Sequence, residues 1–159
     1  MGVSVEELEA LYRNGYAAFA RVASAISGSD ESGIESVQEA FAKAIRSRRT
    51  FRAGASLEAW VWRIVVNTAR SRRVQESRHA AFVGEVSSNG SAPRAGEDAD
   101  VRGSIAALPA RQRETVFLRY FADLDYRSIA LVLGVEVGTV SATLAAAHKA
   151  LREAMEVPT

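Results

Sequence analysis

The sequence predicts an all-α protein made of two small helical domains joined by a flexible linker, the C-terminal one a helix-turn-helix. Three observations support this prediction. Apolar residues recur at helical spacing through most of the 159 residues. A segment of small, polar, Gly- and Pro-containing residues interrupts this pattern near its centre, and the pattern then resumes. We place the domains at residues 1–79 and 101–159 and the linker at residues 80–100.

The first domain is expected to hold three helices. One covers about residues 5–26, up to a break at Gly28, and the next about residues 33–48. Ser56 ends the following loop in position to N-cap a third helix. In that helix Trp60 is expected in the core, whereas Trp62 is open to either a buried or an exposed place. Arg63, Asn67 and Arg70 share another face of the third helix, at i, i+4 and i+7.

The second domain is expected to be helical throughout. A short helix covers about residues 101–108, and Pro109 takes the favoured first position of the next one. Helices at residues 126–133 and 137–155 then follow, separated by a three-residue turn that begins with Gly134. Two helices joined by such a tight turn form the helix-turn-helix pattern.

The composition is that of an ordinary globular protein, with 48% hydrophobic and 25% charged residues. No apolar run approaches the roughly 18 residues of a membrane span, and the acidic N-terminus lacks the pattern of a signal peptide. We therefore expect a cytoplasmic protein without membrane insertion. The absence of Cys excludes disulfides and thiolate metal ligands, and we expect neither a metal nor a cofactor.

The formal net charge of +1 hides an uneven distribution of charge along the chain. Residues 1–40 carry two basic and seven acidic residues, a balance of −5, and residues 41–80 carry ten basic and two acidic residues, a balance of +8. Such a basic block suits a polyanion such as DNA, which its acidic neighbour would repel. By charge alone, a solvated basic helix explains the block equally well.

Two sets of motifs resemble those of bacterial RNA polymerase sigma factors of the extracytoplasmic-function (ECF) branch. The first set is VQEAF at residues 37–41, FRAGASLEAWVWRI at residues 51–64, and Asn67. The second set begins with LPARQRE at residues 108–114 and continues through LRYF, IA, LGV and VGTV at residues 118–140. The resemblance covers about residues 8–73 and 105–152. It implies a non-enzymatic subunit that binds the polymerase core and directs promoter recognition and transcription initiation.

The resemblance also implies a site for each contact of the family. The second helix would dock on the polymerase core, where acidic side chains suit a basic partner surface. The loop and third helix would melt the downstream (minus-ten) element, and phosphate contacts and stacking would offset the cost of unstacking a base. The docking residues implied are Glu35, Gln38, Glu39 and Phe41. The downstream-element residues implied are Arg49, Arg52, Arg63, Asn67, Arg70 and Arg73.

The last helix would read the upstream (minus-thirty-five) element in the major groove. It departs from the family pattern, because it is rich in Ala where relatives carry Lys, Arg and Ser, and Glu136 replaces the usual Ser cap. Residues 111–159 carry six basic and six acidic residues. Since phosphate contacts dominate affinity for DNA, we expect weak or altered upstream recognition. The contacts implied are Arg127, Ser141, Thr143, His148 and Lys149.

Three functions can be compared. A working sigma factor would have the polymerase core, promoter DNA and an anti-sigma factor as partners. A sigma-like regulator that acts through protein contacts is the alternative, because an Ala-faced helix packs well against another protein. An enzyme would need a convergent set of catalytic groups or metal ligands, and the two His residues, His79 and His148, lie in different domains.

Overall fold

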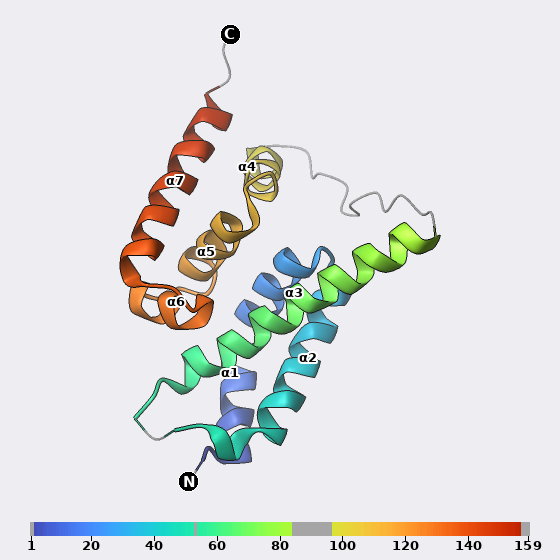
Figure 1. The fold of residues 1–159 in the computed structure, drawn as a ribbon, viewed down its shortest axis with the longest axis vertical. Coiled ribbons are helices and arrows are strands. Elements are labelled where there is room, and N and C mark those ends of the chain that lie inside the picture. Colours follow the sequence, from blue (N-terminus) through green and yellow to red (C-terminus); the bar gives the residue numbers. More distant parts are fainter. Residues whose placement is uncertain (1, 53, 84–96, 157–159) are drawn as a thin grey trace.

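The computed structural model describes residues 2–52, 54–83 and 97–156, which contain helices and no β-strand (Figure 1). The prediction of an all-α fold in two helical domains is confirmed. The first domain consists of α1 (Val5–Ser27), α2 (Asp30–Arg46), the 3-10 helix η1 (Arg48–Thr50) and α3 (Leu57–Val83). The second consists of α4 (Glu97–Ala106), α5 (Ala110–Tyr120), α6 (Tyr126–Leu133) and α7 (Val137–Met155).

Polar caps explain where the helices of the first domain begin and end. Ser4 and Glu7 form a capping box at the start of α1, and Gly28 ends the helix with φ 107°, a left-handed conformation that Gly adopts without strain. The side chain of Ser29 accepts a hydrogen bond from the amide of Ser32, so α2 begins three residues earlier than predicted. Ser56 caps α3 as predicted, at 3.1 Å from the amide of Ala59.

The predicted linker is shorter at both ends than we expected. Residues 80–83 continue α3, and residues 97–100 belong to α4. The intervening residues 84–96 lie outside the described residues.

Aromatic side chains join the three helices of the first domain. Trp62 is 2% exposed and packs on Phe19 of α1. Trp60, expected in the core, is half-buried and instead packs edge-on against Phe51 in the loop before α3. The prediction for Trp60 was therefore wrong in degree, because α1 and α2 cover the face of α3 that carries Trp62, Val65, Val66 and Ala69.

A close approach of backbones sets the packing of α1 against α2. Gly33 is buried, and a Cβ built on it would lie 2.5 Å from the Cα and the backbone nitrogen of Ser24. Only a residue without a side chain fits this contact. The chain thus brings the first turn of α2 directly onto the end of α1.

The second domain has the predicted helix-turn-helix, with α6 and α7 at the predicted bounds. Gly134 ends α6 with φ 69°, and its amide bonds to the carbonyl of Ala130. Leu118, Ile129 and Leu144 pack in the core between α5, α6 and α7. Pro109 is the N-cap of α5 and not its first residue, one position away from the prediction.

The two domains lie against each other, with α6 packed on α3 and α5 on α1 (Figure 1). In the part of the chain that the structure describes, no single helix combines the length and apolar composition needed to cross a membrane. Within these described residues, α6 and α7 reach that length and composition only as a pair, and they are bent by 99°.

Candidate docking and nucleic-acid surfaces

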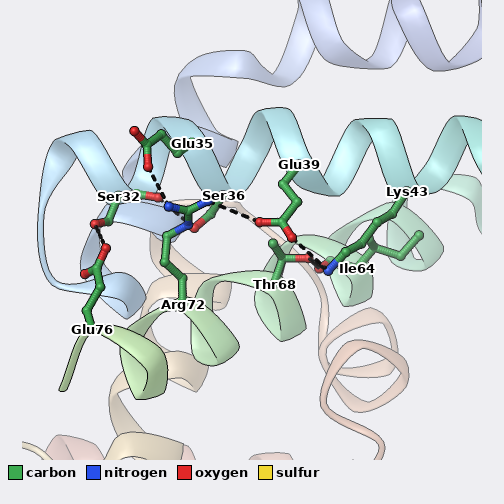
Figure 2. A network of polar contacts seen from close by, with 9 residues as sticks. All are labelled: Ser32, Glu35, Ser36, Glu39, Lys43, Ile64, Thr68, Arg72 and Glu76. Carbon is green, nitrogen blue, oxygen red and sulfur yellow. Dashed lines mark hydrogen bonds and ion pairs between the residues drawn. The ribbon is translucent and has the colours of Figure 1, made fainter. Parts of the chain in front are cut away.

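A polar seam runs between α2 and α3 (Figure 2). Arg72 of α3 reaches across it, with Nη1 2.5 Å from Glu35 and Nη2 3.2 Å from Glu39. Lys43 extends the seam, because its Nζ lies 3.5 Å from Glu39 and 3.4 Å from the hydroxyl of Thr68. The seam holds the acidic side chains of α2 in place while leaving them half-exposed.

Three of the four predicted docking residues lie on the surface of α2. Glu35, Gln38 and Glu39 are exposed. The carboxylates of Glu35 and Glu39 lie beside the guanidinium group of Arg72, as Figure 2 shows. Phe41 is 6% exposed, and its ring packs edge-on against both Tyr12 and Phe19. Its side chain belongs to the core, so Phe41 is not part of the docking surface proposed below.

The residues predicted for the downstream element divide into two groups. Arg49 in η1, Arg52 in the following loop, and Arg63 and Asn67 on α3 are exposed. Arg70 and Arg73 are half-buried, because their guanidinium groups are engaged within the protein. Arg73 donates to the carbonyl of Ile26 at 3.1 Å.

Arg70 pairs with a residue of the other domain. Its Nε and Nη2 donate to the two carboxylate oxygens of Glu114 at 2.8 and 2.5 Å, and its Nη1 lies 3.4 Å from the side-chain oxygen of Asn67. Glu114 is 4% exposed on α5. Sequence reasoning missed this carboxylate, although its i+4 spacing from the buried Leu118 marks a charged residue on an apolar face.

A second arginine lies beside this pair. Burial lowers the pKa of Arg113 from its ordinary value, and the positive charge of Arg73 lowers it further. The charge of Glu114 acts in the opposite direction. Arg73 comes from α3 and Arg113 from α5, so each domain contributes one of these two positive charges.

The residues predicted for the upstream element lie on and around α7. Arg127, Ser141 and Lys149 are exposed, whereas Thr143 and His148 are half-buried. The Nε2 atom of His148 lies 2.7 Å from the hydroxyl of Tyr120, which ties this ring to the end of α5. Glu136 is the N-cap of α7, but its side chain makes no capping hydrogen bond.

An open groove adjoins the start of α7. Sequence reasoning did not single out Arg111, which lines it, although Arg111 lies in the LPARQRE motif. The groove is lined by Pro109, Arg111, Gln112, Gly138, Thr139, Ala142, Thr143 and Ala146. Among the described residues, no group of three or more His, Cys, Asp or Glu is placed to hold a metal ion.

Comparison with known protein families matches both domains. The family model for Sigma-70 region 2 matches residues 11–79, and the model for Sigma-70, region 4 matches residues 99–151. These two matches correspond to the helical domain with the α2–α3 seam and to the helix-turn-helix domain, respectively.

Curated relatives and solved structures agree with these matches. The chain is 32% identical to the RNA polymerase sigma-H factor of Pseudomonas aeruginosa over 75% of this chain and 70% of that protein. It is 31% identical to the ECF RNA polymerase sigma-E factor of Escherichia coli over 72% of this chain and 69% of that protein. The fold is similar to that of the sigma factor RpoE of Bartonella quintana in complex with the anti-sigma factor NepR. That likeness has a TM-score of 0.81 at 22% identity and covers 98% of this chain and 100% of that one.

A second solved structure, CnrH in complex with the cytosolic domain of CnrY, has a TM-score of 0.74 at 18% identity and covers 98% of this chain and 92% of that one. The helix-turn-helix domain, the preceding helical domain and the relatives that share both agree with the resemblance of the motifs. The chain belongs to the extracytoplasmic-function branch of the sigma-70 family, whose members are non-enzymatic subunits that direct RNA polymerase to promoters and start transcription.

Proposed function

We propose that this sigma factor binds the polymerase core with the exposed polar residues of α2 and the downstream promoter element with the exposed face of α3 and the loop before it. The observation that carries the proposal is the separation of charge between these faces. Glu35, Gln38 and Glu39 are exposed on α2, whereas Arg63 and Asn67 are exposed on α3. Each face suits a partner of opposite charge. Since both partners are part of the transcription machinery, we assign the protein to the cytoplasm.

The loop before α3 extends the proposed DNA surface. Arg49 of η1 and Arg52 of the loop are exposed, and Phe51 packs on Trp60 so that the loop is tied to the helix. Arginine side chains can hold phosphates or stack on an unpaired base. The downstream element would therefore lie across the loop and the first half of α3.

For the upstream element we propose weak recognition through Arg127, Ser141 and Lys149, which are exposed. Thr143 and His148 are half-buried and would contribute less. The exposed positions of α7 are dominated by small neutral residues, including Ala142, Ala145 and Ala146. This observation also favours the second candidate function, in which the helix-turn-helix domain acts mainly through protein contacts. An anti-sigma factor is a proposed partner, because the solved structures of similar fold include sigma factors bound to such proteins.

Paired variants test the division of labour. E35A/Q38A should weaken binding to core polymerase in a pull-down, because it removes two of the three exposed side chains of the proposed docking surface of α2. R63A/N67A should retain core binding but lose run-off transcription from a promoter library, because it removes the exposed DNA face of α3. Arg70 is left intact in this design, since its substitution also removes the pair with Glu114. The control is Arg13→Ala, an exposed arginine of α1 paired with Glu9.

Equal loss of core binding in both paired variants would refute the division of labour. Core binding without any transcript from the unsubstituted chain would favour the regulator.

A further inference from the structure

Arg70 has two uses that exclude each other. It belongs to the i, i+4, i+7 face of α3 that we assign to DNA, yet both of its available edges are occupied by Glu114 and Asn67. The two parallel bonds to Glu114 have the geometry with which a guanidinium also binds a phosphate. A carboxylate from the second domain thus occupies the place that a DNA phosphate would take.

The contact reaches beyond one ion pair. Helix α6 lies along α3, and Gly134 at its end comes near Arg63, whose Nη2 lies 4.0 Å from a Cβ built on that Gly. Arg21 of α1 lies over the ring of Phe121 at the end of α5, 5.5 Å from its centroid. Arg63, another residue of the proposed DNA face, is therefore next to the second domain when the domains are packed together.

The same boundary carries an excess of positive charge. Arg70 and Arg73 of α3 meet Arg113 and Glu114 of α5, which leaves three positive groups around one carboxylate. A polyanion that enters would neutralise the two arginines of α3, whereas Glu114 neutralises only one. Arg73 and Arg113 also repel each other in the packed arrangement.

We propose that Arg70 and Glu114 form an intramolecular latch, which holds the helix-turn-helix domain against α3 and keeps Arg70 from DNA until promoter DNA displaces the carboxylate. The latch rests on the proposed role of α3 in DNA binding. It lowers the affinity of the free chain for DNA by the fraction of molecules that are closed. The domains separate when the chain engages the polymerase and a promoter, and Arg70 then passes from the carboxylate to a phosphate.

The closed state can be measured without DNA. The chain has no Cys, so Ala42→Cys on α2 and Ala145→Cys on α7, both exposed positions, place one spin label on each domain. In the labelled chain with Arg70 and Glu114 unchanged, pulsed electron paramagnetic resonance should give a single narrow distribution of the distance between the two labels. E114Q and R70Q should each broaden and lengthen it, and E114Q/R70Q should open the chain no further than either alone, because both remove the same pair.

Two controls distinguish the loss of the latch from a general effect of charge and from misfolding. Glu153→Gln removes the same charge from an exposed position of α7 and should leave the distance distribution unchanged. Helix content by circular dichroism checks that each variant folds. Because Arg70 is half-exposed, R70Q tests the latch even where the buried E114Q disturbs the fold. Unchanged distances in a folded R70Q would overturn the latch.

Binding of a fluorescent, mixed-sequence single-stranded DNA to the full chain tests the competition. E114Q should bind about tenfold more tightly than the unsubstituted chain if about nine in ten molecules are closed, and Glu153→Gln should show only the small gain expected from its lost charge. Opening in E114Q together with tighter binding supports the latch. Opening without tighter binding overturns its competition with DNA and also counts against the DNA role of α3, whereas tighter binding without opening overturns the latch alone.

Discussion

The indole of Trp62 lies against the ring of Phe19, with ring centroids 4.4 Å apart and planes inclined by 38°. Both side chains are buried, and they join the N-terminal part of α3 to α1. Phe19 in turn meets Phe41 of α2 edge-on. One aromatic cluster therefore holds together the three helices that carry the proposed docking and DNA surfaces.

Trp62→Ala should lower the free energy of unfolding by about 3–5 kcal/mol, because it leaves a large cavity in the core. Trp60→Ala should cost clearly less, since the Trp60 ring is half-buried and packs mainly on the loop residue Phe51. Urea denaturation followed by fluorescence measures both, because each variant keeps one of the two Trp residues of the chain as reporter. A loss at Trp60 equal to that at Trp62 would contradict this assignment of the core.

Glu136→Ser should stabilise the second domain. The backbone at Glu136 already has the extended conformation of an N-cap, with φ −77° and ψ 155°, but its side chain makes no capping bond. A Ser hydroxyl there can accept from a free amide of the first turn of α7, and such a cap contributes about 0.5–2 kcal/mol. Thermal denaturation should show a higher midpoint. Ser4→Ala, which removes an existing cap of α1, is the control and should lower it.

The stability of α6 should fall in acid through Asp125. The hydrogen bonds from the backbone amide and side chain of Ser128 hold the pKa of Asp125 below its usual value of 3.8. Because the folded pKa is the lower one, this stabilisation is present above pH 3.8 and is lost as the pH falls through the folded value. Amide exchange of α6 followed by NMR should show fraying over that window. Asp125→Asn keeps a capping oxygen and should remove this pH dependence.

Added positive charge on α7 should strengthen binding to upstream DNA. Ser141 and Ala146 are exposed on that helix, and S141K/A146K would add two ammonium groups to the helix proposed to enter the major groove. Each additional phosphate that the protein neutralises steepens the dependence of log affinity on log salt by about 0.9. Fluorescence polarisation with duplex DNA at several salt concentrations measures this slope.

The matched control for that variant is Ala17→Lys with Ala42→Lys, which adds the same charge at exposed positions of α1 and α2. If both double variants steepen the slope equally, the effect is one of net charge. If the salt slope of S141K/A146K equals that of the unsubstituted chain, α7 does not contact the DNA.

The helices themselves were predictable because their ends are encoded by local chemistry. The bounds of α6 follow from the capping side chain of Asp125 and from Gly134, whose left-handed backbone few other residues adopt. The cap of Ser56 was predictable for the same reason. By contrast, the places of Trp60 and Trp62 depend on which face of α3 meets α1, which helical spacing alone does not specify.

The candidate site was predictable only in part. The shared face of Arg63, Asn67 and Arg70 follows from helical spacing, and the structure has Arg63 and Asn67 exposed on α3. The pairing of Arg70 with Glu114 does not follow, because the two residues are 44 positions apart and on different domains. Similarly, the burial of Phe41 depends on Tyr12 and Phe19 of another helix.

The close contact between Gly33 and Ser24 sets the orientation of α2 relative to α1. Because the backbone of α2 rests on Ser24 there, a methyl group at this position would act as a wedge and swing α2 about its first turn. Glu35, Gln38 and Glu39 lie directly beyond that pivot, so a small tilt would move the whole acidic row. The orientation of the proposed docking surface therefore depends on the absence of a Cβ at Gly33.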